Sequence, residues 1–274
     1  MTDPHTRGEY PTGTGQLLTD LSGDGIATLT FNNPAKRNAL TREMRCALPG
    51  LLGRLNEDRD VRVVVVTGAG DKAFTAGADI SEFGDQRTTT EARAEYDRGQ
   101  AAVAAAWASL EKPVIAMIRG FCLGGGLSVA LQADIRIAAE GSQFGIPAAR
   151  LGLGFGFGGV ARLLSLIGPA AASEVLFSAR RFSATEALQM GLVNRVVPAD
   201  QLAGEVAGLA GAIAQNAPLT VAACKAAIRQ GASAPGQPAT RQVETMIEAC
   251  FQSADYREGQ RAFAEKRPPA FTGR

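Results

Sequence analysis

The stretch that decides the fold is Lys112-Pro113-Val114-Ile115-Ala116-Met117-Ile118-Arg119-Gly120-Phe121-Cys122-Leu123-Gly124-Gly125-Gly126. Residues 113–118 predict a short strand, and the three consecutive glycines open a predicted helix over residues 127–133. Glycines at a strand-to-helix junction let backbone N–H groups approach a ligand without interference from a Cβ atom. The start of a helix adds positive potential. Such N–H groups can hold an oxyanion, although a tight turn packed on a neighbouring strand would need the same glycines.

Strands alternate with helices on both sides of this stretch, up to about residue 198. Alternating or continuous apolar runs predict strands over residues 25–31, 61–67, 135–139 and 193–197. Helical spacing is found over residues 40–55, with Thr41 as the expected N-cap, and over 91–110, 163–167, 170–178 and 183–190. From residue 199 the pattern is helical only, and no repeat of fixed period is found. The sequence therefore predicts an α/β core followed by a small α-helical segment.

The composition is that of a folded protein that binds neither nucleic acid nor a membrane. The chain has 274 residues, of which 46% are hydrophobic, and its net charge of +1 provides no basic field for nucleic acid. Residues 1–15 are polar and rich in Gly, Pro and Thr, which predicts a disordered tail. The apolar runs are judged too short for a membrane span. Four isolated cysteines predict reduced thiols and a cytoplasmic location: Cys46, Cys122, Cys224 and Cys250.

Several common catalytic centres are not expected, because the one histidine is His5, inside the predicted tail. A Ser-His-Asp triad, a Cys-His dyad and a His-ligated zinc site all need a histidine in the folded core. Residues 126–130 imitate the Gly-x-Ser-x-Gly nucleophile elbow around Ser128, but alanine replaces the final glycine. Residues 154–159 spell a Gly-x-Gly-x-x-Gly fingerprint, without the preceding strand or the later acidic residue that a dinucleotide site needs.

Motifs spread from Leu17 to Phe271 resemble the crotonase (enoyl-CoA hydratase/isomerase) superfamily. The strongest are residues 33–40 (NPAKRNAL), 74–80 (FTAGADI) and 112–126, which stand in the order that the family has. Shorter matches continue the series at residues 134–138, 144–147, 158–159, 162–163, 187, 191–193, 258–259, 262–263 and 265–267. One such motif carries little weight, and so many in the same order carry a great deal.

The resemblance implies an α/β fold, a crotonase-like spiral of ββα units over residues 16–198 with a C-terminal α-helical trimerisation region over residues 199–274. It implies self-association as a trimer or a dimer of trimers. It also implies an acyl-CoA thioester as substrate, with coenzyme A arriving as part of that substrate, and no permanently bound cofactor or metal. By position, the backbone N–H groups of Ala78 and Gly125 would form the oxyanion hole that stabilises an enolate.

The same resemblance places other residues along CoA. Lys36 and Arg37 would meet its phosphate-rich end, and Lys266 would reach the CoA of a neighbouring subunit. The further CoA-binding positions that it implies are Ala39, Ala76, Ala78, Asp79, Ile80, Ser81, Phe121 and Gly125. Solvated surface charge explains Lys36, Arg37 and Lys266 equally well, since lysine and arginine are mostly exposed in proteins.

The chain departs from the family pattern at its acid and base positions. Hydratases of this family place one glutamate two residues after the triple glycine and a second directly after the Phe-Gly-x-Pro stretch. Those positions are Ser128 and Ala148 here, and the position that some dienoyl isomerases use is Gly156. Water addition needs a positioned acid or base, which neither serine nor alanine supplies near neutral pH. The sequence therefore predicts weak or absent hydration of crotonyl-CoA.

Three interpretations follow. In the first, a family enzyme takes its acid or base from Glu82, Asp85 or Tyr96, which follow the second motif. It could also catalyse a decarboxylation that needs mainly the oxyanion hole, because loss of CO₂ itself generates the enolate. In the second, the protein is a hydratase or isomerase for an unusual acyl-CoA, in which Ser128 positions water. In the third, it binds CoA without turnover.

Overall fold

Two β-sheets form the centre of the molecule, whose computed structural model describes residues 6–8, 10, 12–82 and 89–274. Within these residues the larger sheet has the strand order β1 (Thr6–Gly8), β2 (Leu17–Ser22), β3 (Ile26–Phe31), β4 (Val63–Gly68), β6 (Val114–Ile118), β8 (Ile135–Ala139) and β11 (Arg195–Val197). The smaller sheet has the order β10 (Phe182–Ser183), β9 (Gln143–Gly145), β7 (Phe121–Leu123) and β5 (Ala73–Thr75). Both sheets are mixed, because parallel central strands are joined by antiparallel edge strands.

A unit of two strands and a helix is repeated along the chain. In each unit the first strand joins the larger sheet and the second joins the smaller sheet. The units are β4–β5–α3 (Thr90–Ser109), β6–β7–α4 (Gly125–Ala130) and β8–β9–α5 (Phe157–Ser178), with 3₁₀ turns η2 (Ile80–Glu82) and η3 (Pro147–Leu151) before α3 and α5. Strands β4, β6 and β8 pair in parallel, and so do β5, β7 and β9. Equivalent strand ends therefore lie side by side, and the predicted spiral of ββα units is confirmed.

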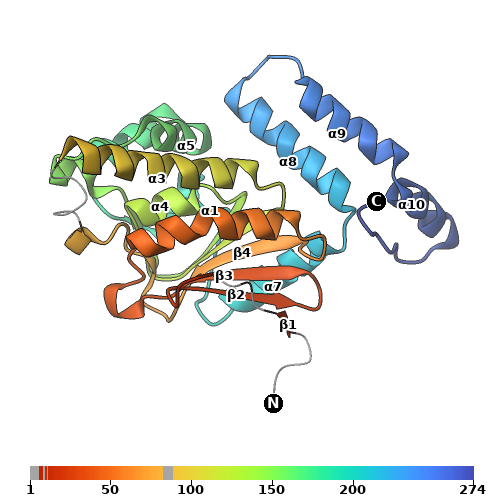
Figure 1. The fold of residues 1–274 in the computed structure, drawn as a ribbon, viewed down its shortest axis with the longest axis horizontal. Coiled ribbons are helices and arrows are strands. Elements are labelled where there is room, and N and C mark those ends of the chain that lie inside the picture. Colours follow the sequence, from red (N-terminus) through yellow and green to blue (C-terminus); the bar gives the residue numbers. More distant parts are fainter. Residues whose placement is uncertain (1–5, 9, 11, 83–88) are drawn as a thin grey trace.

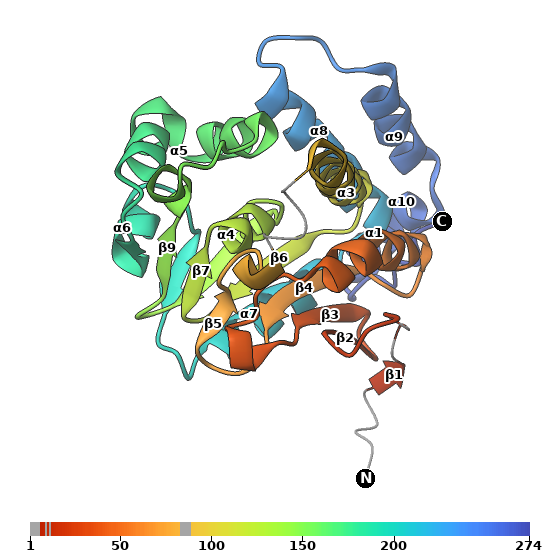
Figure 2. The same cartoon turned by 60° about the vertical axis from the view of Figure 1, so that its left-hand side comes forward.

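Helices cover both faces of the larger sheet (Figure 1; Figure 2). All four valines of residues 63–66 are buried, as expected for a strand with helices on both sides. One face packs on α1 (Arg42–Glu57), through Met44, Leu48, Leu51, Leu52 and Leu55. The other packs on α7 (Leu202–Ala214), through Leu202, Val206 and Ala210. Thr41 caps α1 as predicted, because its hydroxyl accepts a hydrogen bond from Met44 N at 3.2 Å.

Most helices lie where their spacing predicted, and the differences are local. The break expected inside residues 163–178 is present within α5, where Gly168 has φ 73° and ψ 171° and is followed by proline. Ser183 caps α6 (Ala184–Gln189) as part of a capping box with Glu186. Helix α4 begins at Gly125, two residues earlier than predicted. The strands of the smaller sheet were not predicted, because runs of two or three residues are too short to show a period.

The expectation of a disordered tail over residues 1–15 is corrected for the part of it that the structure describes. Strand β1 pairs antiparallel with β2. Tyr10 N donates to Thr19 Oγ1 at 2.8 Å, and Tyr10 Oη donates to Asp58 Oδ2 at 2.5 Å. These contacts depend on backbone pairing and single polar side chains, which hydrophobic periodicity does not reveal.

The predicted boundary at residue 199 is moved towards the C-terminus, because α7 belongs to the core. Helices α8 (Pro218–Ser233), α9 (Arg241–Gln252) and α10 (Ala254–Glu265) stand beside it (Figure 1). Lys225 on α8 is 7% exposed, lies 2.8 Å from Asp134 Oδ2 and donates to the Lys112 carbonyl at 2.6 Å. Burial lowers the pKa of Lys225 to about 8. The ion pair joins the C-terminal helices to the residue before β8, and the hydrogen bond to Lys112 joins them to the turn before β6.

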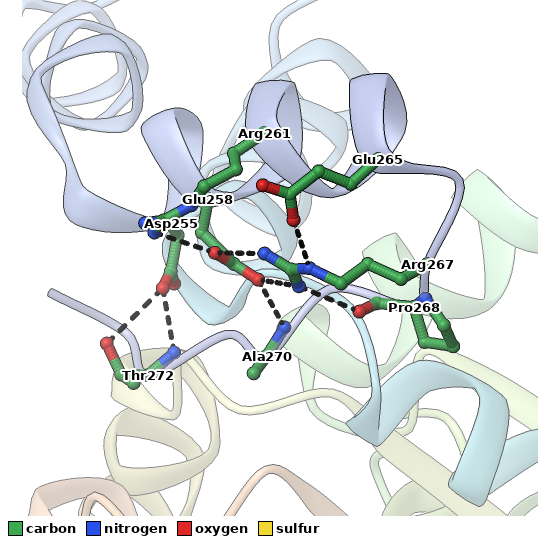
Figure 3. Close-up of polar contacts among 8 residues, drawn as sticks. All are labelled: Asp255, Glu258, Arg261, Glu265, Arg267, Pro268, Ala270 and Thr272. Carbon is green, nitrogen blue, oxygen red and sulfur yellow. Dashed lines mark hydrogen bonds and ion pairs between the residues drawn. The ribbon is translucent and has the colours of Figure 1, made fainter.

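The chain after α10 folds back along that helix (Figure 3). Asp255 accepts hydrogen bonds from the backbone N–H groups of residues 272–273 at 2.7 and 2.8 Å. Glu258 accepts from Arg267 Nη1 at 2.5 Å and from Ala270 N at 3.1 Å. Asp255 and Glu258 of α10 therefore hold the last described segment of the chain, and the expected region of helices after the α/β core is confirmed.

By length and composition, one helix of the described residues could cross a membrane, namely α5 with 22 residues. Helices α7 and α8 meet the same criterion only when they are taken together across a bend of 108°. The expectation that every apolar run is too short is corrected for α5. The non-helical conformation at Gly168 nevertheless divides α5 into two shorter pieces.

Asn38 holds the loop between β3 and α1 against the turn between β4 and β5. Its side chain is fully buried, and its Oδ1 accepts a hydrogen bond from Asn33 N at 3.0 Å. Its Nδ2 donates to the carbonyls of Ala69 and Ala73 at 2.9 and 2.7 Å. One amide side chain therefore satisfies three buried or partly buried backbone groups, which is costly to undo.

We expect Asn38→Ala to lower the free energy of unfolding by about 3 kcal/mol, because it leaves these backbone groups without partners. Urea unfolding followed by circular dichroism measures the change. Asn32→Ala is the matched control, since Asn32 makes an exposed hydrogen bond to the Gly15 carbonyl and should cost less than about 1 kcal/mol. Equal effects of the two substitutions would contradict the role given to Asn38.

Candidate active site

Two turns at the ends of β5 and β7 approach each other closely. Strand β5 leads into Gly77 and Ala78, and β7 leads into Gly124 and Gly125. Gly77 has φ 101° and Gly124 has φ 53°, a region that favours glycine. A Cβ atom on Gly125 would lie 3.3 Å from Ala78 N, and one on Gly77 would lie 3.2 Å from Gly125 N. The amide nitrogens of residues 78 and 125 are therefore brought together by two turns that have no room for side chains between them.

Hydrogen bonds fix these turns and leave two N–H groups unused. Leu40 N donates to the Gly77 carbonyl at 2.7 Å, and Asp79 N donates to the Leu40 carbonyl at 3.0 Å. Among residues 6–8, 10, 12–82 and 89–274, no acceptor is found for the N–H of Ala78 or of Gly125. The N–H of Gly125 is one of the first donors of a helix, which have no partner inside the helix. Two neighbouring unused donors are what an oxyanion hole requires.

The positions of the two absent glutamates both lie near Gly124. Ser128 N donates to the Gly124 carbonyl at 3.1 Å, so Ser128 lies one helical turn away. Ala148 follows Pro147, whose Cδ lies 3.8 Å from a Cβ atom built on Gly124. Both side chains are partly buried, and the Ser128 hydroxyl is 3.4 Å from the Gly124 carbonyl, to which it donates. The structure thus brings together residues 128 and 148, which are 20 positions apart in the sequence.

Gly156 is the exposed N-cap of α5. Its carbonyl accepts hydrogen bonds from the N–H groups of Gly159 and Val160 at 3.0 and 3.2 Å, as in any helix start. The element before Gly156 is the 3₁₀ turn η3, not a strand. The glycines at residues 154–159 therefore lack the strand-to-helix setting of a dinucleotide site, and Gly156 supplies no acid or base.

Lys36, Asp79 and Ser81 form one polar cluster beside the turn at residue 78. Lys36 Nζ donates to Asp79 Oδ2 at 2.7 Å and to Ser81 Oγ at 3.1 Å. Ser81 donates to Asp79 Oδ1 through its backbone N at 3.0 Å and its hydroxyl at 2.6 Å. The hydrogen bond from Lys36, followed by that from Ser81, lowers the pKa of Asp79. Asp79 is therefore an ionised carboxylate that fixes Lys36, which is itself 55% exposed.

Arg37 turns away from Lys36 and lies over a different side chain. Its Cζ is 5.1 Å from the ring centroid of Phe121, close enough for a cation–π contact. Its carbonyl accepts from Ala76 N at 3.0 Å. Ala39 is 8% exposed, so it contributes mainly through its backbone. The predicted CoA-binding positions of the first and second motifs are thus neighbours in space.

Lys266 and Ile80 are the remaining predicted CoA-binding positions. Ile80 is the first residue of η2. Lys266 is the exposed C-cap of α10, in the left-handed conformation with φ 52°. Its contact with the CoA of a neighbouring subunit stays a prediction.

The alternative acids face α1 in the structure. Glu82 Oε2 accepts a hydrogen bond from Arg42 N at 2.9 Å, at the start of α1. Tyr96 accepts from Gln100 Nε2 at 3.0 Å, and the guanidinium of Arg45 lies 4.8 Å from the centroid of its ring. Asp85 lies outside the described residues. A catalytic role for any of the three stays a prediction.

Sequence reasoning missed Arg181. Its Cζ also lies 5.1 Å from the centroid of the Phe121 ring. No local pattern links residues 121 and 181, which are 60 positions apart. Arg181 also lines a cavity of about 620 Å³ together with Gln143, Ser183 and Glu186. That cavity lies at the edge of the smaller sheet and includes neither Ala78 nor Gly125 among its lining residues. Within the described residues, no group of three His, Cys, Asp or Glu side chains is placed to hold a metal ion.

Comparison with known proteins agrees with this geometry. Residues 22–274 match the family model described as enoyl-CoA hydratase/isomerase. A short-chain-enoyl-CoA hydratase of Clostridium acetobutylicum is 39% identical over 242 residues, which is 88% of this chain and 92% of that protein. A carnitinyl-CoA dehydratase of Salmonella agona is 35% identical over 253 residues, which is 91% of this chain and 95% of that protein.

Solved structures give the same result. An enoyl-CoA hydratase/carnithine racemase from Magnetospirillum magneticum superposes with a TM-score of 0.90 at 36% identity, over 97% of each chain. The fold is therefore the crotonase fold, with two mixed sheets and C-terminal helices, and it defines an acyl-CoA enzyme. The chain belongs to the enoyl-CoA hydratase/isomerase (crotonase) superfamily.

We expect Asp79→Asn to lower the free energy of unfolding by about 1–2 kcal/mol at pH 7, because it removes a charge-assisted hydrogen bond. The folded pKa of Asp79 lies below its ordinary value, so this stability is present above about pH 4 and is lost as pH falls through the folded pKa. The gap between wild type and variant should therefore narrow in acid. Urea unfolding between pH 3 and pH 7 measures it.

Asp20→Asn is the matched control for this experiment, since Asp20 is exposed on β2. Its effect should be small at every pH. A gap for Asp79→Asn that stays constant down to pH 3 would mean that the carboxylate charge contributes nothing.

Proposed function

We propose that the protein polarises the carbonyl of an acyl-CoA thioester with the N–H groups of Ala78 and Gly125 and so stabilises an enolate. The observation that carries this proposal is the pair of unused amide donors where the turns after β5 and β7 meet. Preorganised backbone donors act without reorganisation at the moment of reaction, and each contributes a few kcal/mol. Gly125 adds the positive end of α4.

The acid or base that completes the reaction is not at the positions that family hydratases use. Ser128 and Ala148 stand where those glutamates would be, near Gly124. Hydration of a simple enoyl-CoA is therefore expected to be weak, since it needs a positioned carboxylate for water. The relatives named as a hydratase and a dehydratase support an acyl-CoA thioester as the substrate. The substitutions favour a reaction that makes a lower demand on acid–base groups, such as decarboxylation.

Two other functions remain as alternatives. A hydratase or isomerase for an unusual acyl-CoA would use Ser128 to position water, and the hydroxyl of Ser128 already donates to a backbone carbonyl. A CoA-binding protein without turnover would keep the oxyanion hole and the polar cluster at Lys36 and Asp79. Trimeric or hexameric assembly and a cytoplasmic location are further parts of the proposal. The four free cysteines support a reducing compartment.

Gly125→Ala tests the oxyanion hole. The new Cβ atom would lie 3.3 Å from Ala78 N and fill the place of the thioester oxygen, while the backbone conformation at residue 125 suits alanine. We expect turnover to fall by about 100-fold or more, with the thermal midpoint little changed. A cinnamoyl-CoA thioester gives a second measurement, because its absorption moves to longer wavelength when its carbonyl is polarised. The variant should lose this shift.

Gly158→Ala is the matched control, because a Cβ atom there meets nothing within 4 Å. A mass-spectrometric screen of acyl-CoA thioesters identifies the reaction to be followed. Binding of acyl-CoA without any product would favour the non-catalytic alternative. A Gly125→Ala protein that still shifts the cinnamoyl absorption would exclude the proposed oxyanion hole.

Restoring the two carboxylates tests the role of their absence. We expect the double variant Ser128→Glu with Ala148→Glu to hydrate crotonyl-CoA about 100-fold or more faster than wild type, because it returns an acid and a base to the site. Loss of absorbance at the enoyl chromophore measures hydration. The matched control is Ser128→Gln with Ala148→Gln, which has the same size and cannot exchange protons. Rapid hydration of crotonyl-CoA by the wild-type protein would refute the expectation that hydration is weak without the two glutamates.

A further inference from the structure

A short row of residues crosses one face of the smaller sheet. Phe121 on β7 is in register with Gln143 on β9, and Gln143 is in register with Ser183 on β10. Successive side chains of a strand alternate between the two faces of a sheet. Cys122 and Phe144 are buried on the core side, so Phe121 and Gln143 face outward.

Two arginines belong to this outward row. The guanidiniums of Arg37 and Arg181 each lie 5.1 Å from the centroid of the Phe121 ring, so they are at most about 10 Å apart. They come from distant segments, one before α1 and the other just before β10. Nη1 of Arg181 also donates to Gln143 Oε1, at 3.4 Å. The ring and the amide thus hold Arg181 in one place on the sheet.

Neither arginine is neutralised by a carboxylate of the described residues. Both side chains are exposed, and the guanidinium of Arg181 donates to the neutral amide of Gln143. Arg180, the preceding residue, is the contrast: it pairs with Glu174 and Glu186 at 2.7 Å each and lies over Phe182. Arg180 therefore has a structural role that Arg181 does not share.

Two uncompensated cations at most about 10 Å apart repel each other, but only weakly, because salt screens exposed charges over about 8 Å at physiological ionic strength. A bound anion would remove the repulsion. Guanidinium groups match phosphate oxygens with paired hydrogen bonds, and they keep their charge at any ordinary pH. The ligand that Arg37 and Arg181 fit is therefore a phosphate group.

Arg37, Arg181 and the Phe121 ring lie next to the proposed CoA site, to which Arg37 is joined by its backbone. The carbonyl of Arg37 accepts from Ala76 N at 3.0 Å, two residues before Ala78. Lys36 does not take part, because it donates to Asp79 and Ser81. The cavity that Arg181 lines also contains two carboxylates, Glu140 and Glu186, of which Glu186 is occupied by Arg180 and Ser183. An anion is therefore placed at the Phe121 side of Arg181.

We propose that Arg181 binds a phosphate group of the CoA nucleotide together with Arg37, and that Phe121 is the platform on which both guanidiniums rest. This inference rests on the proposed acyl-CoA function. It adds a nucleotide-recognition residue that the sequence motifs did not contain. It also makes the protein selective for a phosphorylated CoA over a pantetheine thioester.

Isothermal titration of the full chain with one acyl group on three carriers tests this assignment: CoA, 3′-dephospho-CoA and pantetheine. We expect Arg181→Met to weaken binding of the acyl-CoA by about tenfold. Methionine keeps the packing on Phe121 and removes the charge. Arg181→Lys should lie in between, because an ammonium lacks the paired donors. Arg59→Met is the matched control, since Arg59 is exposed between α1 and β4.

The three carriers separate the two sources of phosphate. If Arg181→Met loses affinity for acyl-CoA alone, Arg181 is assigned to the 3′-phosphate. If the variant loses affinity for acyl-CoA and for its dephospho form, but not for acyl-pantetheine, Arg181 is assigned to the pyrophosphate. An equal loss with all three carriers, or no loss with any, overturns the inference and leaves the proposed function intact. A wild-type protein that binds none of the thioesters overturns both.

Discussion

The close approach of two backbone turns, after β5 and after β7, is the constraint on which the rest of the site depends. It is possible because Gly77, Gly124 and Gly125 leave no side chain between the amides of residues 78 and 125. Parallel pairing within the smaller sheet brings the two strand ends together, and helix α4 starts at one of them. The repeated ββα unit therefore creates the site, since it places equivalent turns at the same edge.

Binding chemistry and reaction chemistry are separated in this molecule. The groups that would hold a thioester are backbone N–H groups, fixed by hydrogen bonds such as those of Leu40. The groups that would move protons are side chains, and at positions 128 and 148 they are a serine and an alanine. A scaffold can keep the first while it loses the second, because the backbone geometry does not depend on those two side chains. Family membership therefore defines the substrate class more firmly than the reaction.

Charge acts locally here, because the net charge is only +1. Asp79 fixes Lys36 on one side of the loop between β3 and α1, while Phe121 supports Arg37 on the other. The ion pair of Lys225 and Asp134 has a different role, since it joins α8 to the core. Removing Asp134 would leave the buried ammonium of Lys225 without its charged partner.

The amino-acid sequence by itself determined the alternation of strands and helices, the cap at Thr41, the break in α5 and the order of the family motifs, because these are local patterns of a few residues. It also showed that two glutamates are absent. It did not reveal the strands of the smaller sheet, which are too short to show a period. Only the tertiary structure decided that α7 belongs to the core and that Arg181 shares a ring with Arg37. Contacts between residues more than 100 positions apart depend on how the sheets pair, and no local pattern records that pairing.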